Sequence, residues 1–268
     1  MMDEMGMVEY APGEPRGTHW HPHRGFETVT WLRAGTFLHQ DSHGGGGRIE
    51  AGDTQWMTAG AGILHIETPP EELVVSGGLF HGIQLWVNLP PHLKFAPPRY
   101  QDIPGERVTE WVSLDGGGRV KVIAGELYGV KGPGVTHTPI TLANVVIQPG
   151  HELTLPWNTA HNALVYVLNG VGTVGGKGAV VGNGELAVLG AGEQLVLRAA
   201  KTQPGSSDGL DVLVLGGKPL KAPVHQYGPF VMNTQAQLRE AVEDYQAGRF
   251  GVIPPGALMP HYVEGQRV

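Results

Sequence analysis

Two short polar pairs, His21-Pro-His23 and His65-Ile-Glu67, are the stretches on which the fold of this chain depends. In each pair one residue separates the two ionisable side chains, and on a β-strand this spacing places both side chains on the same face. Two such strands lying side by side would direct three imidazoles and one carboxylate at a single point. The pattern therefore predicts a metal site, provided that the two strands meet.

The composition limits the kinds of protein to which such a site could belong. The chain has 268 residues, enough to bury a sizeable core in one large or two smaller domains. A formal net charge of −7 and the lack of any Lys- and Arg-rich run argue against a nucleic-acid-binding surface. No apolar run is long enough to span a bilayer, and the N-terminus is acidic, so we expect a cytoplasmic protein without membrane contact. Because there is no cysteine, His and carboxylate oxygen must hold any metal.

The distribution of glycine, proline and β-branched residues indicates a turn-rich β protein. The chain has 42 glycines and 21 prolines, and its short strand patterns recur as they do in a barrel or sandwich. Strands are expected over residues 27–32, 36–40, 54–57 and 79–88 and around His65. The turn at Ala34-Gly35 predicts that the first two of these strands form a hairpin. Residues 1–18 hold no complete strand pattern.

The second half of the chain resembles the first half. A stretch rich in Pro, Gly and charge, residues 97–118, is expected to connect the halves, although residues 107–114 could add a strand. Aligning the glycine turns of the two halves replaces the four polar residues of the opening pairs by Pro156, Asn158, Leu197 and Ala199. Since all four are lost together in the second copy, we infer that they act as one unit in the first.

One helix is predicted near the C-terminal end, over residues 235–247. Thr234 and Gln237 fit a capping box, apolar residues follow at helical spacing, and Gly248 suits the position after the last turn. One face of this helix should pack on a barrel, and the tail from residue 252 to 268 should run over the surface.

Five longer motifs resemble those of the pirin family of bicupins, over nearly the whole chain. They are His21-Pro-His-Arg-Gly-Phe-Glu-Thr-Val-Thr30, Gly52-Asp-Thr-Gln-Trp-Met-Thr-Ala-Gly60, His65-Ile-Glu67, Gln84-Leu-Trp-Val-Asn-Leu-Pro90 and Gly228-Pro-Phe-Val-Met-Asn-Thr234. The resemblance implies an all-β fold of two tandem cupin (jelly-roll type) β-barrels with a C-terminal helix. We assign residues 1–105 to an N-terminal metal-binding barrel. Residues 106–268 are assigned to a C-terminal barrel without metal ligands, together with the helix over 235–247.

In the pirin pattern the metal ligands fall on His21, His23, His65 and Glu67. The general cupin motif instead takes a Glu four residues after the second His, which makes Glu27 a rival ligand; the same-face spacing with His65 favours Glu67. Pirins also usually carry further N-terminal strands, so we expect a shortened start and an incompletely closed first barrel.

The resemblance implies one divalent metal ion, usually iron. Three neutral imidazoles and one carboxylate leave two open positions at octahedral geometry, as non-haem Fe(II) sites do. Ligand type alone leaves Mn, Co, Ni, Cu and Zn open.

Several further residues are candidates for the surroundings of the metal. Substrate contacts are expected from an apolar mouth with one amide, formed by Trp56, Met57, Phe80, Gln84 and Trp86, with simple barrel core as the alternative. Arg24 could neutralise an anionic substrate or cover the rim, and His81 could support the ligands or only pack. The histidines without a paired spacing are expected to be solvated or structural: His19, His39, His43, His92, His137, His151 and His225.

The resemblance implies two functions of different classes. The first is an Fe(II)-dependent oxidoreductase, a quercetinase-type dioxygenase that acts on a flavonol or related phenolic and O₂, with Glu67 as the catalytic base. The second is a non-catalytic regulator whose metal redox state tunes binding to a metabolic or transcriptional protein partner. A metal that only stabilises the barrel is the third possibility. We expect a monomer without direct nucleic-acid contact.

Overall fold

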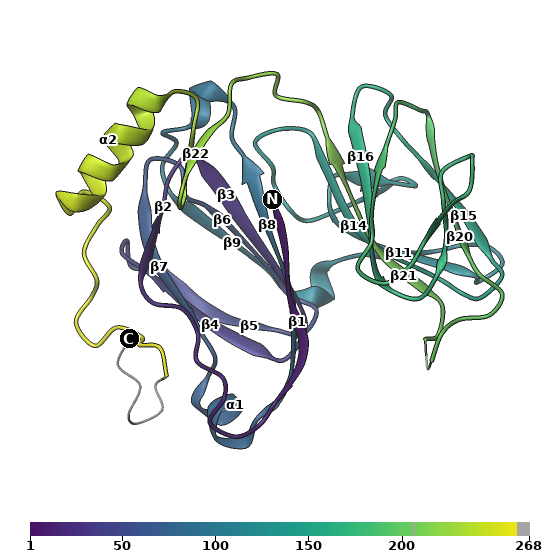
Figure 1. Ribbon diagram of the computed structural model, residues 1–268, viewed down its shortest axis with the longest axis horizontal. Helices are drawn as coiled ribbons and strands as arrows, with labels where there is room; N and C mark the ends of the chain where they lie inside the picture. Colours follow the sequence, from purple (N-terminus) through teal and green to yellow (C-terminus); the bar gives the residue numbers. More distant parts are fainter. Residues whose placement is uncertain (206, 262–268) are drawn as a thin grey trace. The chain divides into compact units, whose positions relative to one another are not determined.

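The structure is a computed structural model that describes residues 1–205 and 207–261. Strands dominate this part of the chain and one longer helix lies near its C-terminal end, which confirms the predicted all-β class with a C-terminal helix (Figure 1). The internal contacts divide the chain into two units. Unit 1 is Met1–Glu106 together with the chain from Lys221 onward, and unit 2 is Arg107–Leu220.

Unit 1 contains two antiparallel sheets that together form the first barrel. Their strand orders are β1-β8-β3-β6-β9 and β2-β7-β4-β5, and the hairpin β22–β23 is separate. The strands are β1 (Met2–Tyr10), β2 (His21–His23), β3 (Phe26–Ala34), β4 (Thr36–Asp41), β5 (Gly46–Glu50), β6 (Thr54–Thr58), β7 (Ile63–Thr68), β8 (Gly78–Asn88), β9 (Arg99–Ile103), β22 (His225–Tyr227) and β23 (Phe230–Met232). The helical elements are α1 (Glu71–Ser76), η1 (Pro91–Leu93), η2 (Gly105–Arg107, which ends in unit 2) and α2 (Gln235–Gln246).

Unit 2 repeats this plan around a core rich in valine and leucine. Its sheets have the orders β10-β11-β14-β21-β16-β19 and β15-β20-β17-β18, and β12–β13 forms a small hairpin. The strands are β10 (Glu110–Val112), β11 (Gly118–Ala124), β12 (Glu126–Leu127), β13 (Val130–Lys131), β14 (Ile140–Ile147), β15 (Glu152–Pro156), β16 (Asn162–Asn169), β17 (Gly172–Val174), β18 (Ala179–Val181), β19 (Leu186–Leu189), β20 (Gln194–Ala199) and β21 (Leu210–Gly217).

Strand β1 corrects the prediction that the first 18 residues hold no complete strand. It pairs antiparallel with β8, with a bulge between Met5 and Val8. The bulge shifts the side-chain alternation by one residue, so that Met5 and Tyr10 both pack on the same apolar cluster. A pattern search with a fixed period of two residues therefore misses the strand.

The Gly35 turn corrects the predicted hairpin. Strand β3 pairs with β6 and β8, whereas β4 pairs with β5 and β7, so the turn carries the chain from one sheet to the other. Gly35 has φ +84°, and a Cβ at this position would lie 2.8 Å from the carbonyl oxygen of Leu79. Only glycine fits this corner without strain.

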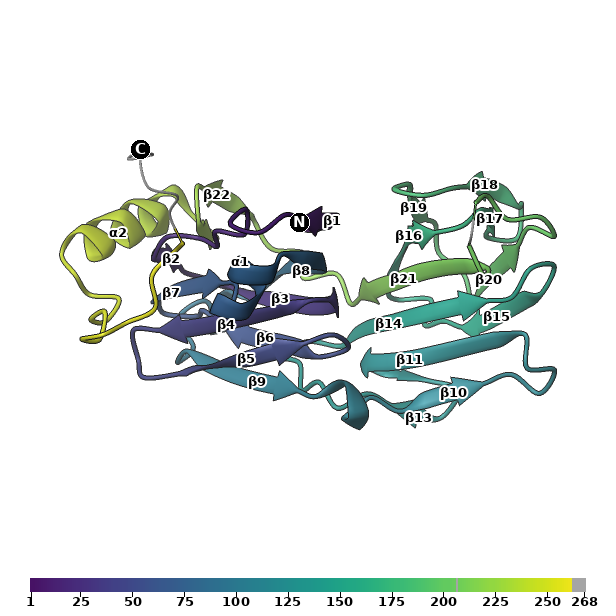
Figure 2. The same ribbon diagram turned by 90° about the horizontal axis from the view of Figure 1, so that it is seen from below.

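The C-terminal segment corrects the predicted domain assignment, because residues from Lys221 onward belong to unit 1 and not to the second barrel. In Figures 1 and 2 this segment, coloured yellow-green to yellow, lies beside β2 and β7. The Arg24 guanidinium donates to Asp244 at 2.7 Å, and the Trp20 indole donates to the Leu258 carbonyl at 3.0 Å. The apolar face of α2 packs with Phe250 against Phe230 on β23 and Leu64 on β7. The predicted capping box is present, since the Gln237 amide donates to the Thr234 hydroxyl at 3.1 Å.

Neither helix of the described residues has the length and apolarity that a membrane-spanning helix requires.

A buried lysine links the backbone that follows His23 to the C-terminal segment. The Lys94 side chain is fully buried, and its ammonium donates to the carbonyls of Gly25 at 2.7 Å and Val231 at 2.6 Å and to the Asn88 side chain at 2.5 Å. Burial lowers the Lys94 pKa to about 8. Three acceptors from distant parts of the chain therefore share one cation.

Replacing this lysine by an apolar residue tests the arrangement. We expect Lys94→Met to lower the free energy of unfolding of the metal-free protein by about 3 kcal/mol, because three buried acceptors lose their donor. The exposed Lys121 on β11 provides the control, and Lys121→Met should change stability by less than about 0.5 kcal/mol. Chemical denaturation measures both; equal effects of the two substitutions would contradict the assigned role.

Candidate metal centre

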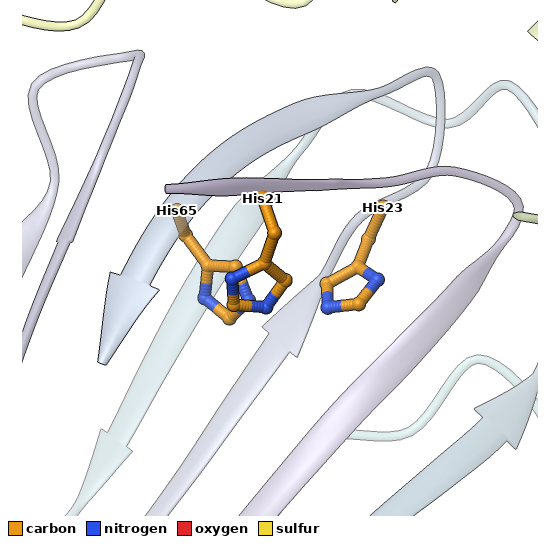
Figure 3. Close-up of side chains that lie close together, drawn as sticks. All are labelled: His21, His23 and His65. Carbon is orange, nitrogen blue, oxygen red and sulfur yellow. The ribbon is translucent and has the colours of Figure 1, made fainter. Parts of the chain in front are cut away.

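The pairing of β2 with β7 brings the two opening pairs together, as the sequence predicted. His21 lies directly opposite His65 in this antiparallel pair. The His21 ring centroid is 4.8 Å from that of His23 and 4.3 Å from that of His65, and the His23 and His65 centroids are 4.9 Å apart. Figure 3 shows the three rings projecting from the same side of the strands. The three imidazoles thus share one small space inside the first barrel.

The hydrogen bonds of the rings leave nitrogen lone pairs free for a ligand. The Nδ1 atoms of His21 and His23 lie 2.8 and 3.4 Å from the carbonyl oxygens of His19 and Pro229. A ring that donates from Nδ1 keeps the Nε2 lone pair free. His65 is fully buried, and neither of its ring nitrogens has a hydrogen-bond partner among the described residues. Buried polar atoms without a partner are rare and call for a bound group.

Burial keeps the His23 and His65 rings neutral. Burial, together with the neighbouring His21, lowers the pKa of His23 to about 3, although the bond to Pro229 opposes the shift. Burial also lowers the pKa of His65 well below its ordinary value, with the neighbouring imidazoles adding to the effect. A neutral imidazole is the form that binds a metal ion.

The fourth predicted ligand, Glu67, lies on the same face of β7 as His65. Its side chain is buried and accepts from the Gln84 amide at 3.2 Å on each oxygen and from the Thr30 hydroxyl at 3.4 Å. Burial raises the pKa of the Glu67 carboxyl, while nearby His21 and the two donors oppose the shift.

These residues fit a divalent metal ion. One nitrogen from each of His21, His23 and His65 lies within 4.8 Å of the others, and Glu67 stands outside this tight group. The buried His65 has no hydrogen-bond partner for its ring nitrogens among the described residues, so a nitrogen lone pair is available to the ion. Imidazole ligands with a carboxylate at hand suit first-row divalent metals.

Residues 1–87 match the pirin family, and residues 142–251 match the pirin C-terminal cupin domain. The chain belongs to the pirin family. Both matches confirm the two cupin domains that the sequence motifs predicted.

Three similar proteins illustrate the relatives of this pirin. Human pirin is 37% identical over 246 residues, which cover 91% of this chain and 81% of the human protein. A Pseudomonas aeruginosa protein with the provisional name quercetin 2,3-dioxygenase is 39% identical over 252 residues, which cover 93% of this chain and 85% of that protein. A crystal structure of a quercetin 2,3-dioxygenase from Acinetobacter baumannii is similar at a TM-score of 0.86 and 40% identity, over 94% of this chain and 86% of that one.

The second barrel of this pirin shows no comparable site in its described residues, where no other group of three potential ligands lies together. Its β15–β20 pair presents leucines to the core, with Leu153 opposite Leu197. The residues aligned from the sequence are accordingly either buried and apolar, as Leu197 and Ala199 are, or exposed, as Pro156 and Asn158 are.

Strand alternation separates Glu67 from its rival Glu27. Thr30 bonds to Glu67, so the even-numbered residues of β3 face β7. Glu27 projects from the opposite face and accepts from the Thr58 hydroxyl at 2.6 Å. The geometry favours Glu67.

The five predicted substrate contacts lie in different places. Gln84 contacts Glu67, and Trp86 lies against His23 with ring centroids 5.4 Å apart, so both border the site. Met57 lies opposite Thr28, on the face of β6 that points towards β7, and packs with Ala59 and Ile63. Trp56 is fully buried on the opposite face of β6, and Phe80 packs with the Leu32 cluster.

Some residues around the site differ from expectation. Arg24 is buried against α2 and cannot neutralise a substrate, and His81 bonds to Glu4 on β1 at 2.8 Å, away from the ligands. Of the two roles expected for His39, solvated or structural, burial excludes the first, since it is 2% exposed and lies opposite Glu67 on β4. Phe26 was missed and packs against Trp86 with ring centroids 4.4 Å apart. The alternation Phe37, His39, Asp41 could have placed His39 inside.

Charge-neutralising substitutions distinguish the two candidate carboxylates. We expect Glu67→Gln to weaken metal binding at least about tenfold, because the buried carboxylate beside the imidazoles is lost. Glu27→Gln should leave metal affinity unchanged, since its side chain faces away. Metal content after dialysis and isothermal titration measure both. A loss of metal from Glu27→Gln alone would reverse the assignment.

The His23 pKa predicts how the metal-free protein responds to acid. An unfolded His titrates near about 6.5, and in the folded state His23 titrates at about 3. Between these values the unfolded state binds the extra proton, so the stability contributed by His23 is lost as the pH falls. Relative to His23→Gln, the wild type should lose up to about 2 kcal/mol between about pH 7 and pH 5. Urea denaturation at the two pH values measures this; parallel pH dependence in both proteins would refute it.

Proposed function

We propose that this pirin is a quercetinase-type dioxygenase that acts on a flavonol or a related phenolic at a mononuclear iron site. The observation that carries the proposal is a cluster of three imidazoles next to a buried, hydrogen-bonded carboxylate. The similarity at 40% identity to a quercetin 2,3-dioxygenase supports the same activity.

Iron is the metal that this proposal requires. His21, His23 and His65 would hold it, with Glu67 as a fourth ligand. Bound Fe(II) would supply Lewis-acid and one-electron chemistry towards a chelating phenol and O₂. Elemental analysis of protein purified without added metal distinguishes iron from Mn, Co, Ni, Cu and Zn.

Glu67 is proposed to take the proton of the substrate hydroxyl. Burial raises its pKa, which makes the carboxylate a stronger base than an exposed Glu. The Gln84 amide and the Thr30 hydroxyl donate to its oxygens and fix the position of the carboxylate. Glu67 would thereby offer a proton acceptor at a fixed position beside the bound substrate.

Trp86, packed against the fully buried Phe26, is proposed to bind the flat substrate. Both rings contact His23, with centroids 5.1 and 5.4 Å from its ring, and Trp86 is partly exposed. A planar phenolic could stack there with its oxygens towards the imidazoles.

Oxygen uptake tests the function. Iron-loaded protein should consume O₂ with flavonols and not with flavones that lack the 3-hydroxyl group, because Glu67 then has no proton to take. Per bound iron, Glu67→Gln should lower kcat by about 10²- to 10⁴-fold, and Glu27→Gln should match the wild type. If iron-loaded protein binds flavonols without consuming O₂, the proposal fails.

A further inference from the structure

The internal repeat reveals an uncovered sheet edge in unit 2. In unit 1 the outer edge of β6 is paired along its full length by β9, from Thr54 opposite Ile103 to Thr58 opposite Arg99. The corresponding strand of unit 2 is β19, which pairs with β16 as β6 pairs with β3. No described strand pairs with the other edge of β19. Unit 2 therefore lacks the strand that covers this position in unit 1.

The side chains of β19 show the same difference. All five residues of β6 are buried, whereas Leu186 and Val188 of β19 are 47% and 75% exposed. A hollow of about 520 Å³ beside β19 extends the apolar surface, with Trp157, Val188 and Leu195 among its walls. Isolated exposed apolar residues are common, but an apolar run on an unpaired strand edge is a template for another strand.

Most other edges of the four larger sheets carry a residue that discourages pairing. The outer strands β1, β5, β9, β10 and β15 contain charged side chains, and β2 contains Pro22. The exceptions are β19, with the sequence Leu186-Ala-Val-Leu189, and the three-residue strand β18. Edge strands that stay unpaired are normally protected by charge or proline.

We propose that the β19 edge binds the β19 edge of a second copy of this chain, so that the two six-stranded sheets become continuous across a two-fold axis. With the axis at Ala187, Leu186 lies opposite Val188 of the second copy on the exposed face, and small Ala187 side chains meet at the axis. Glu185 then lies opposite Leu189, so no like charges face each other. The contact uses the same patch on both copies and closes at a dimer. It stands apart from the proposed oxygenase activity, and it replaces the monomer expected from the sequence.

Sedimentation over a concentration series tests the association. The holoprotein, from about 5 to about 500 µM, should pass reversibly from monomer to dimer and no further. Val188→Lys should raise the dissociation constant at least about tenfold, because a charge then stands on the paired edge. Leu114→Lys, at a fully exposed position of a unit 2 loop, should dimerise like the wild type. Metal content and melting temperature verify that both variants are folded.

A cross-linking experiment tests the register independently of affinity. The chain has no cysteine, so Ala187→Cys introduces a single thiol at the predicted axis. Opposed residues of an antiparallel pair lie within disulfide range, and mild oxidation should give a covalent dimer. Leu114→Cys should give much less. A monomer at all concentrations, growth beyond a dimer, a dimer that survives Val188→Lys, or equal cross-linking of the two cysteine variants would overturn the proposal.

Discussion

An imidazole buried without a partner for its nitrogens is the constraint on which this structure depends. His65 is fully buried and neither of its ring nitrogens has a partner among the described residues, and His21 and His23 add two more rings within 5 Å of its own. Such a cluster is costly in a folded protein unless a bound group satisfies it. The surrounding fold keeps the three rings close together, and burial keeps those of His23 and His65 neutral. Converging imidazoles of this kind are able to bind a divalent metal ion.

The His23 ring is oriented by a backbone group from a distant part of the chain. The carbonyl of Pro229 contacts this ring, and the next residues after His23 contact the same C-terminal segment. Arg24 pairs with Asp244, and a Cβ on Gly25 would lie 2.2 Å from the Val231 carbonyl oxygen. The motif therefore needs Arg and Gly at these positions for packing against the C-terminal segment. Its two histidines are the candidate metal ligands.

The sequence allowed the histidine cluster to be predicted because the spacing of its residues is local. One intervening residue on each strand determines the face, and the pairing of β2 with β7 then required only that the strands meet. The errors arose from interactions without a local signature. The β1 bulge interrupts the alternation, the Gly35 corner resembles a hairpin turn, and the contact between Arg24 and Asp244 joins residues 220 positions apart. Trp56 was wrongly predicted to line the substrate pocket because composition indicates only that aromatic residues lie on the strands. The alternation along each strand decides which face of the sheet a residue occupies.

The return of the C-terminal segment to unit 1 has a consequence for biosynthesis. The ribosome releases the residues that form β2 and β7 early, but Pro229, Val231 and Asp244 emerge only after all of unit 2. Unit 2 is a contiguous stretch and can fold while later residues are still being translated, whereas unit 1 is completed only by residues that follow unit 2. A chain that stopped before Pro229 would therefore contain all three histidines of the cluster but lack the carbonyl that contacts the His23 ring.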